Sequence, residues 1–128
     1  MPNPTTPDAP SLVIVAHGSR RTAANVEIAQ LVEQIAHQAR EQYAKVTYGF
    51  LEMAEPSIPD AIQSCITAGA TTVRVVPYFL AAGRHVTDDI PHQVQLKQAE
   101  YPEIDIQIKP SLGSVADLPA LLLQIANS

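Results

Sequence analysis

Three side chains that commonly bind metal ions follow three apolar runs of the chain. His17 and Glu52 come directly after the first two runs, and His85 lies in the segment that follows the third. Two imidazoles and one carboxylate can hold a divalent cation with bonds of about 2.0–2.2 Å and leave coordination positions open. Because a catalytic or metal-transfer site needs an open position, we predict these residues as both the metal ligands and the catalytic groups.

The apolar runs have the composition of buried strands. Short runs rich in β-branched residues alternate with longer segments of helical periodicity, which is the order that βαβ units produce. We therefore predict an α/β fold, a four-stranded, mainly parallel, doubly wound sheet flanked by helices, with flavodoxin-like topology and the strand order 2-1-3-4. The predicted strands are 12–16, 45–51, 71–79 and 104–108, the last at an edge, and the predicted helices are about 22–43, 57–69, 88–101 and 116–126.

This topology explains how residues far apart in the sequence can meet. In an open parallel sheet the carboxyl ends of the strands lie at one edge, and ligands bind in the crevice where the strand order reverses. Neighbouring strands are about 4.8 Å apart, so His17, Glu52 and His85 can reach one ion. We expect His85 to lie in a loop that runs through Gly83 to about residue 88.

The length, charge and cysteine content of the chain argue against several classes of protein. The 128 residues support one core, so we expect a disordered, proline-rich leader over residues 1–10 and a single domain over 11–128. A net charge of −5 argues against a nucleic-acid partner. The single Cys65 cannot form an internal disulfide, which fits a cytoplasmic protein. No apolar run approaches the roughly 18–20 residues of a membrane-spanning helix, so no membrane role is expected.

Several nucleotide-binding and hydrolase motifs are missing from the sequence. The five glycines form neither a P-loop nor a dinucleotide fingerprint, so ATP and NAD are not expected and no permanently bound cofactor is predicted. The G-x-S-x-G motif of α/β-hydrolases is also missing. Ser19 is therefore a poor candidate nucleophile despite the nearby His17.

Segments around the three candidate ligands resemble the motifs of the sirohydrochlorin chelatase family, the small CbiX-type cobaltochelatases and their ferrochelatase relatives. The segments are 16–20 (AHGSR), 50–57 (FLEMAEPS), 77–86 (PYFLAAGRHV) with 88–91 (DDIP), and, more weakly, 110–113 (PSLG). Members of this family insert a divalent metal into a tetrapyrrole without ATP. The resemblance implies that His17 and His85 handle the metal and that Glu52 is a third ligand or a proton acceptor.

The resemblance also implies the substrates, which are sirohydrochlorin and a divalent metal ion, Co²⁺, Fe²⁺ or Ni²⁺. Sirohydrochlorin is a polycarboxylate, and Arg20, Arg21 and Arg84 flank the two histidines. Since guanidinium groups bind carboxylates through paired donors, we predict that these arginines, together with Ser19, bind the tetrapyrrole. The macrocycle loses two pyrrole protons as the metal enters, and imidazole, with an ordinary pKa of about 6.5, suits proton transfer near neutral pH.

Two other functions remain open from the sequence. A metal carrier or tetrapyrrole-binding protein would use the same His-Glu-His cluster without turnover. A flavodoxin-like module would have no metal role at all.

The resemblance further implies a homodimer. Many members of the family carry two such domains in tandem, whereas this chain holds one, so two chains would pair to enclose the macrocycle. The candidate contact is the last predicted helix, whose apolar residues would otherwise cover the sheet. They are Leu118, Leu121, Leu122, Leu123 and Ile125.

Overall fold

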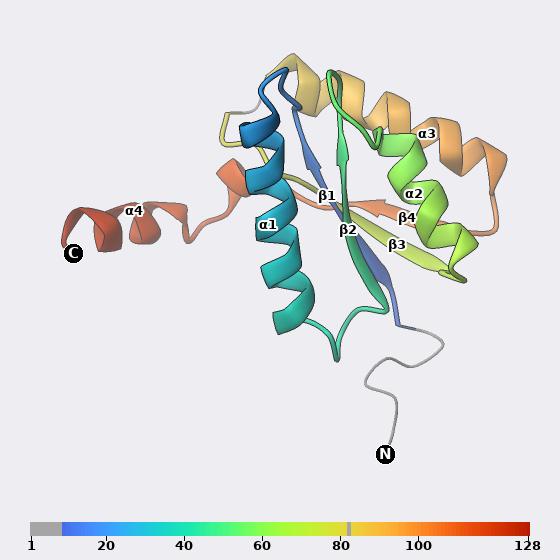
Figure 1. The fold of residues 1–128 in the computed structure, drawn as a ribbon, viewed down its shortest axis with the longest axis horizontal. Coiled ribbons are helices and arrows are strands. Elements are labelled where there is room, and N and C mark those ends of the chain that lie inside the picture. The colour runs from blue at the N-terminus through green and yellow to red at the C-terminus, as the bar shows by residue number, and fades with distance from the viewer. Residues whose placement is uncertain (1–8, 82) are drawn as a thin grey trace.

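The strands form one parallel sheet in the predicted order. The computed structural model describes residues 9–81 and 83–128, and for His85 and Val86 it describes the backbone alone. Of the predicted leader, residues 1–8 lie outside the described part of the chain. The strands β1 (Ser11–Ala16), β2 (Lys45–Phe50), β3 (Thr72–Pro77) and β4 (Asp105–Ile108) lie in the order β2-β1-β3-β4, and each neighbouring pair is parallel (Figure 1). The predicted α/β fold and strand order are confirmed, with β4 at an edge.

Helices cover both faces of this sheet. The helix α1 (Thr22–Gln38) lies against one face, and α2 (Ile58–Thr67) and α3 (Ile90–Glu100) lie against the other (Figure 1). Every residue of β1 is buried, because this central strand is covered from both sides. Its side chains alternate, so Val13 and Val15 belong to the core cluster under α2 and α3, while Leu12 and Ile14 belong to the cluster under α1.

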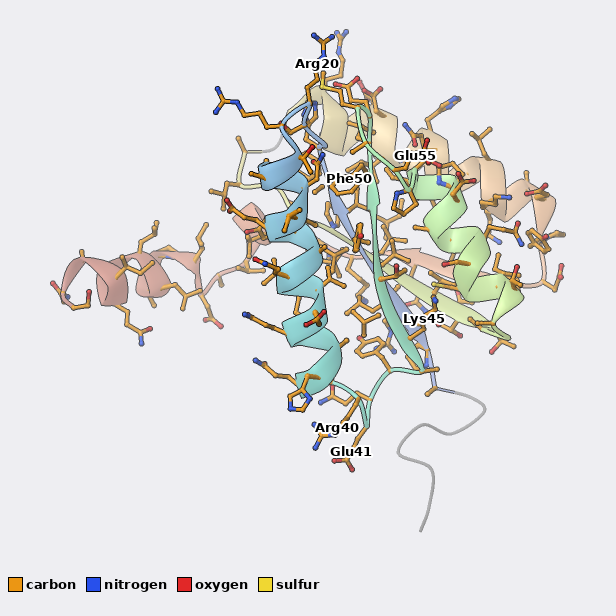
Figure 2. The ribbon with its side chains drawn as sticks, viewed as in Figure 1. Arg20, Arg40, Glu41, Lys45, Phe50 and Glu55 are labelled. Atoms are coloured by element: carbon orange, nitrogen blue, oxygen red, sulfur yellow. The ribbon has the colours of Figure 1, made fainter. Side chains whose placement is uncertain are left out.

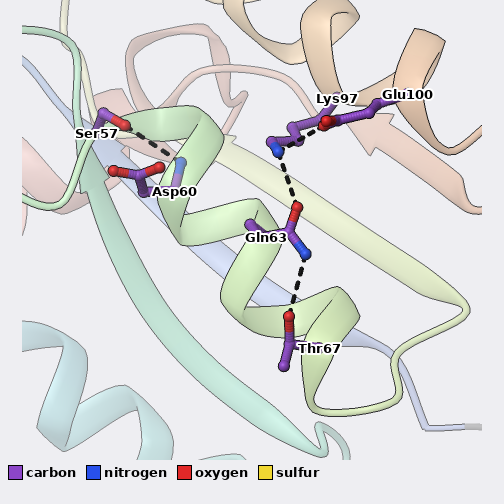
Figure 3. A network of polar contacts seen from close by, with 6 residues as sticks. All are labelled: Ser57, Asp60, Gln63, Thr67, Lys97 and Glu100. Atoms are coloured by element: carbon purple, nitrogen blue, oxygen red, sulfur yellow. Dashed lines mark hydrogen bonds and ion pairs between the residues drawn. The ribbon is translucent and has the colours of Figure 1, made fainter.

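Polar side chains define the start of α2 and join this helix to α3 (Figure 3). The Ser57 hydroxyl accepts a hydrogen bond of 3.2 Å from the backbone N–H of Asp60, which satisfies one free donor of the first turn. The Lys97 ammonium group donates to Gln63 Oε1 at 2.8 Å and pairs with Glu100 at 2.6 Å. Gly69 follows the C-cap of α2 with φ +106°, a left-handed conformation that glycine adopts without strain.

Two predicted boundaries are wrong. The helix α1 ends at Gln38 rather than near residue 43, because Tyr43 turns back to pack on the α1 side of the sheet, where its hydroxyl accepts a hydrogen bond from Arg74. The expected loop around His85 is instead one turn of π-helix, His85–Asp89, that leads directly into α3. The Thr87 backbone N–H and hydroxyl both donate to the carbonyl of Gly83, which stabilises this turn.

The last helix, α4 (Leu118–Ala126), extends away from the sheet (Figure 1). None of its residues is buried, and Leu121, Leu122, Leu123 and Ile125 are 47–70% exposed. The alternative that these apolar residues cover the sheet therefore does not hold for the chain by itself, and α4 stays the candidate contact for a second copy. Within the described residues, no helix has both the length and the apolar character needed to cross a membrane.

Candidate active site

His17 and Glu52 meet at the carboxyl edge of the sheet. His17 follows β1 and Glu52 lies just beyond β2, the neighbouring strand, and the distance from His17 Nε2 to Glu52 Oε2 is 2.9 Å. The two side chains are 42% and 46% exposed, so the pair is open to solvent on one side. This contact confirms that the topology brings these two predicted residues together. An accessible imidazole beside a carboxylate can bind a cation or accept a proton.

The backbone holds this pair in place. Beyond the strand ends, the N–H of Leu51 donates to the carbonyl of Ala16 at 2.9 Å, and the N–H of Glu52 donates to the carbonyl of His17 at 3.0 Å. Gly18, with φ +96°, packs directly against the backbone of Glu52 and leaves no room for a side chain. The two loops therefore form one unit. Only glycine fits at position 18, between His17 and Ser19, because the position has a positive φ and no space for a side chain.

The three predicted arginines lie in segments that leave this edge, Arg20 and Arg21 between β1 and α1 and Arg84 after β3. Arg20, Arg21 and Arg84 are all exposed. Figure 2 shows Arg20 at the end of the molecule where β1 and β2 finish, with its guanidinium directed away from the sheet. The Ser19 hydroxyl accepts a hydrogen bond of 3.0 Å from the backbone N–H of Arg21, so it shapes the turn from which the first two arginines project.

A shallow cavity of about 260 Å³ adjoins His17. It lies between the end of β1, the first turns of α1 and the residues that follow β3, where Tyr78 and Phe79 form an apolar wall. Tyr78 is 41% exposed beside it. Sequence reasoning missed Tyr78 as a wall of the site, because it reads as one more apolar residue of the third strand. The volume of this cavity lies just below the range of about 300–1,000 Å³ that is typical of small-molecule pockets.

The position of the third predicted ligand is described only by its backbone. His85 begins the π-helical turn that follows β3, and because β1 and β3 are parallel neighbours, this turn starts from the same edge of the sheet as the loop after β1 (Figure 1). Its side chain lies outside the described part of the structure, and its place beside His17 and Glu52 stays a prediction. Among the side chains that the structure describes, no group of three His, Cys, Asp or Glu residues is arranged to hold a metal ion.

Cys65 takes no part in this arrangement. The side chain lies in α2, is fully buried and interacts with Ser11 at the opposite end of β1. Burial raises the pKa of the Cys65 thiol, and interactions with Ser11, Lys45 and Ser64 oppose this shift. A neutral, buried thiol is a packing group rather than a metal ligand.

Comparison with known proteins identifies relatives over nearly the whole chain. The CbiX family model matches residues 11–128. A chloroplastic sirohydrochlorin ferrochelatase of Arabidopsis thaliana is 37% identical over 120 residues, which are 94% of this chain and 51% of the relative. A sirohydrochlorin cobaltochelatase of Methanocaldococcus jannaschii is 40% identical over 86 residues, 67% of this chain and 59% of the relative. The chain thus spans between half and two thirds of the length of these relatives.

Solved structures share the fold. A CbiX protein of Marinobacter aquaeolei superimposes with a TM-score of 0.78 over 92% of this chain and 94% of that chain, at 24% identity. The sirohydrochlorin chelatase SirB of Bacillus subtilis subspecies spizizenii, solved in complex with cobalt, superimposes with a TM-score of 0.72 at 32% identity. This second likeness covers 80% of this chain and 43% of SirB.

Proposed function

Because this chain belongs to the CbiX family, we propose that it inserts a divalent metal ion into sirohydrochlorin without consuming ATP. Relatives named sirohydrochlorin ferrochelatase and cobaltochelatase support this activity. The observation that carries the proposal is the 2.9 Å contact between His17 Nε2 and Glu52 Oε2 at the carboxyl edge of the sheet. Co²⁺, Fe²⁺ or Ni²⁺ is a substrate in this reaction, and no resident cofactor is invoked.

The proposed chemistry assigns proton transfer and metal delivery to the same few groups. A free-base tetrapyrrole loses two N–H protons as the metal enters, so the reaction needs acceptors that lie beside the metal. His17 and Glu52 are close enough to share one ion or one proton. We assign His17 as a metal ligand and proton acceptor, Glu52 as its partner in either role, and His85 as the third ligand.

The substrate is proposed to lie over the apolar wall, with its carboxylates turned outward. Tyr78 and Phe79 offer apolar surface to the ring. Arg20, Arg21 and Arg84 are exposed around the same edge and can bind peripheral carboxylates, as can the Ser19 hydroxyl. An acidic protein with local arginines at one edge directs an anionic substrate to that edge.

We also propose that two copies of the chain pair to enclose the macrocycle. The cavity beside His17, at about 260 Å³, provides only one shallow wall. The exposed apolar residues of α4 supply a surface that water solvates poorly and that a second copy would cover. Each such side chain contributes about 1.5–3 kcal/mol when it is fully buried. A symmetric dimer is the commonest way for one surface to cover itself.

The cytoplasm is the proposed compartment. The free, buried Cys65 is typical of proteins from a reducing environment. The Arabidopsis relative carries the description chloroplastic, so the compartment differs among organisms.

Turnover is the direct test of this function. Sirohydrochlorin is mixed with Co²⁺ under anaerobic conditions without ATP, with protein at about one hundredth of the substrate concentration, and the absorbance of the macrocycle is followed. Conversion of many equivalents per protein supports the chelatase. Conversion or binding of one equivalent would instead identify a metal carrier or a tetrapyrrole-binding protein.

A further inference from the structure

The side chain of Asn25 occupies both backbone polar groups of Ser19. Asn25 Oδ1 accepts a hydrogen bond of 3.0 Å from the Ser19 N–H, and Asn25 Nδ2 donates to the Ser19 carbonyl at 2.8 Å. Both lengths are typical of well-formed hydrogen bonds. One amide therefore fixes the peptide groups on either side of Ser19, two residues after His17.

Asn25 is an unfavourable choice for its own helix. It is the fourth residue of α1, which begins at Thr22, and asparagine stabilises a helix less than alanine does. Its amide is directed to the loop that precedes the helix, so the two hydrogen bonds give that loop a defined shape. A residue that weakens its own element and orders a neighbouring loop is typical of a functional site.

The other end of the same loop is held by Glu52. The Glu52 N–H donates to the His17 carbonyl at 3.0 Å, and Gly18 is packed against the Glu52 backbone. Between this anchor and Ser19 lies only Gly18, the residue type with the greatest backbone freedom. The conformation of the loop that carries His17 thus depends on a fixed point on each side of the glycine, and Asn25 supplies the second point.

We propose that Asn25 is a positioning residue for metal insertion, which holds the His17 imidazole in register with the Glu52 carboxylate. This inference rests on the proposed function for its kinetic part, while its structural part stands without it. Asn25 lines the cavity beside His17 but acts through the Ser19 backbone. Ser19, which Asn25 holds, in turn shapes the turn from which Arg20 and Arg21 project, because its hydroxyl accepts a hydrogen bond from the Arg21 N–H.

Two variants separate the hydrogen bonds from simple packing. Asn25→Leu keeps a side chain of similar size and removes both bonds, whereas Asn25→Asp retains the acceptor for the Ser19 N–H and removes the donor to its carbonyl. The matched control is Gln30→Ala, which removes an exposed amide from the same helix. Thermal unfolding of all three variants reports the fraction of folded protein at the assay temperature.

The measurements are amide hydrogen exchange at Ser19, the affinity for Co²⁺ alone, and the kinetics with sirohydrochlorin. We expect Asn25→Leu to speed exchange of the Ser19 amide by about tenfold or more, to weaken Co²⁺ binding, and to lower kcat by about tenfold or more with a smaller change in KM. Asn25→Asp should give intermediate values, and Gln30→Ala should match the original chain.

The proposal is overturned if the Ser19 amide of Asn25→Leu exchanges no faster than that of Gln30→Ala. It is also overturned if activity falls only in proportion to the unfolded fraction, which would make Asn25 a purely structural residue. If the original chain does not turn over sirohydrochlorin, the proposed function fails, and hydrogen exchange at Ser19 together with the affinity for Co²⁺ still decides whether Asn25 positions this loop.

Discussion

Gly18 and Glu52 pack backbone against backbone, so that a Cβ placed on Gly18 would lie 1.8 Å from the carbonyl oxygen of Glu52. Two non-bonded atoms cannot lie this close together, so a side chain at this position would require the backbone to move. The same two loops carry the His17 imidazole and the Glu52 carboxylate, which are 2.9 Å apart. The geometry of the candidate site therefore requires glycine, the residue without a side chain, at position 18.

Gly18→Ala is expected to damage both stability and activity. The Ala side chain would force the two loops apart. The fold would also require alanine to adopt the left-handed conformation that glycine has here, so we expect the free energy of unfolding to fall by about 3 kcal/mol or more. Gly69→Ala is the matched control, because Gly69 has φ +106° but nothing within 4 Å of its Cβ position. The control should lose about 1–2 kcal/mol and keep its activity. Urea denaturation and initial rates check both, and equal losses in the two variants would argue against close packing at Gly18.

Charge reversal at Arg20 should weaken substrate binding more than it slows the chemical step. Arg20→Glu replaces a donor for peripheral carboxylates with a repelling charge, so KM is expected to rise by about tenfold with a smaller fall in kcat. Arg40→Glu is the control, since Figure 2 shows Arg40 at the opposite end of the molecule. A fall in kcat at unchanged KM would place Arg20 in the chemistry itself.

Acidic substitutions on α4 should separate the proposed dimer. Leu122 and Ile125 are 59% and 70% exposed, so changing both to Asp leaves the core of one chain intact while charging the contact surface. Light scattering is expected to report about twice 13.8 kDa for the original chain and about 13.8 kDa for the double variant. Gln124→Glu, on the same helix, should remain dimeric. A double variant that still has the mass of a dimer would show that α4 is not the interface.

The Cys65 thiol should make stability fall at high pH. Burial raises its pKa in the folded chain above the ordinary value of 9.0, so the unfolded chain releases this proton first. The contribution of the protonated Cys65 thiol to the free energy of unfolding is fully present below about pH 9 and is lost as the pH rises further. Between about pH 8 and pH 10, urea midpoints should fall more for the original chain than for Cys65→Ala. If the urea midpoints of the two proteins fall equally with pH, the raised pKa of Cys65 is contradicted.

The sequence predicts the sheet well because the strands carry their own signal. Runs such as 12–16 are continuously apolar, and this pattern is typical of a strand covered on both faces. The end of α1 was less predictable, since Tyr43 continues the helical spacing of apolar residues but is drawn onto the sheet by tertiary contacts. The position of α4 could not be predicted either. Its apolar sequence indicates that it packs against another apolar surface, but not whether that surface is this sheet or a second copy of the chain.

The candidate site was predictable only in part, for a similar reason. His17 and Glu52 were predictable because both follow strands whose order fixes where they end. The contact between Asn25 and Ser19 joins a helix to a loop through one amide, and no periodicity indicates such a bond. The unfavourable helix propensity of asparagine near the start of α1 was the available signal.

The initial rate of metal insertion by His17→Ala tests the proposed catalytic role of His17 most directly. His17 lies outside the core on a loop and is 42% exposed, so the variant should remain folded. We expect its rate of Co²⁺ insertion into sirohydrochlorin to fall by about a hundredfold or more, while His92→Ala, a change at an exposed position of α3, keeps the original rate. A His17→Ala protein that inserts the metal at nearly the original rate would contradict the assignment of this site.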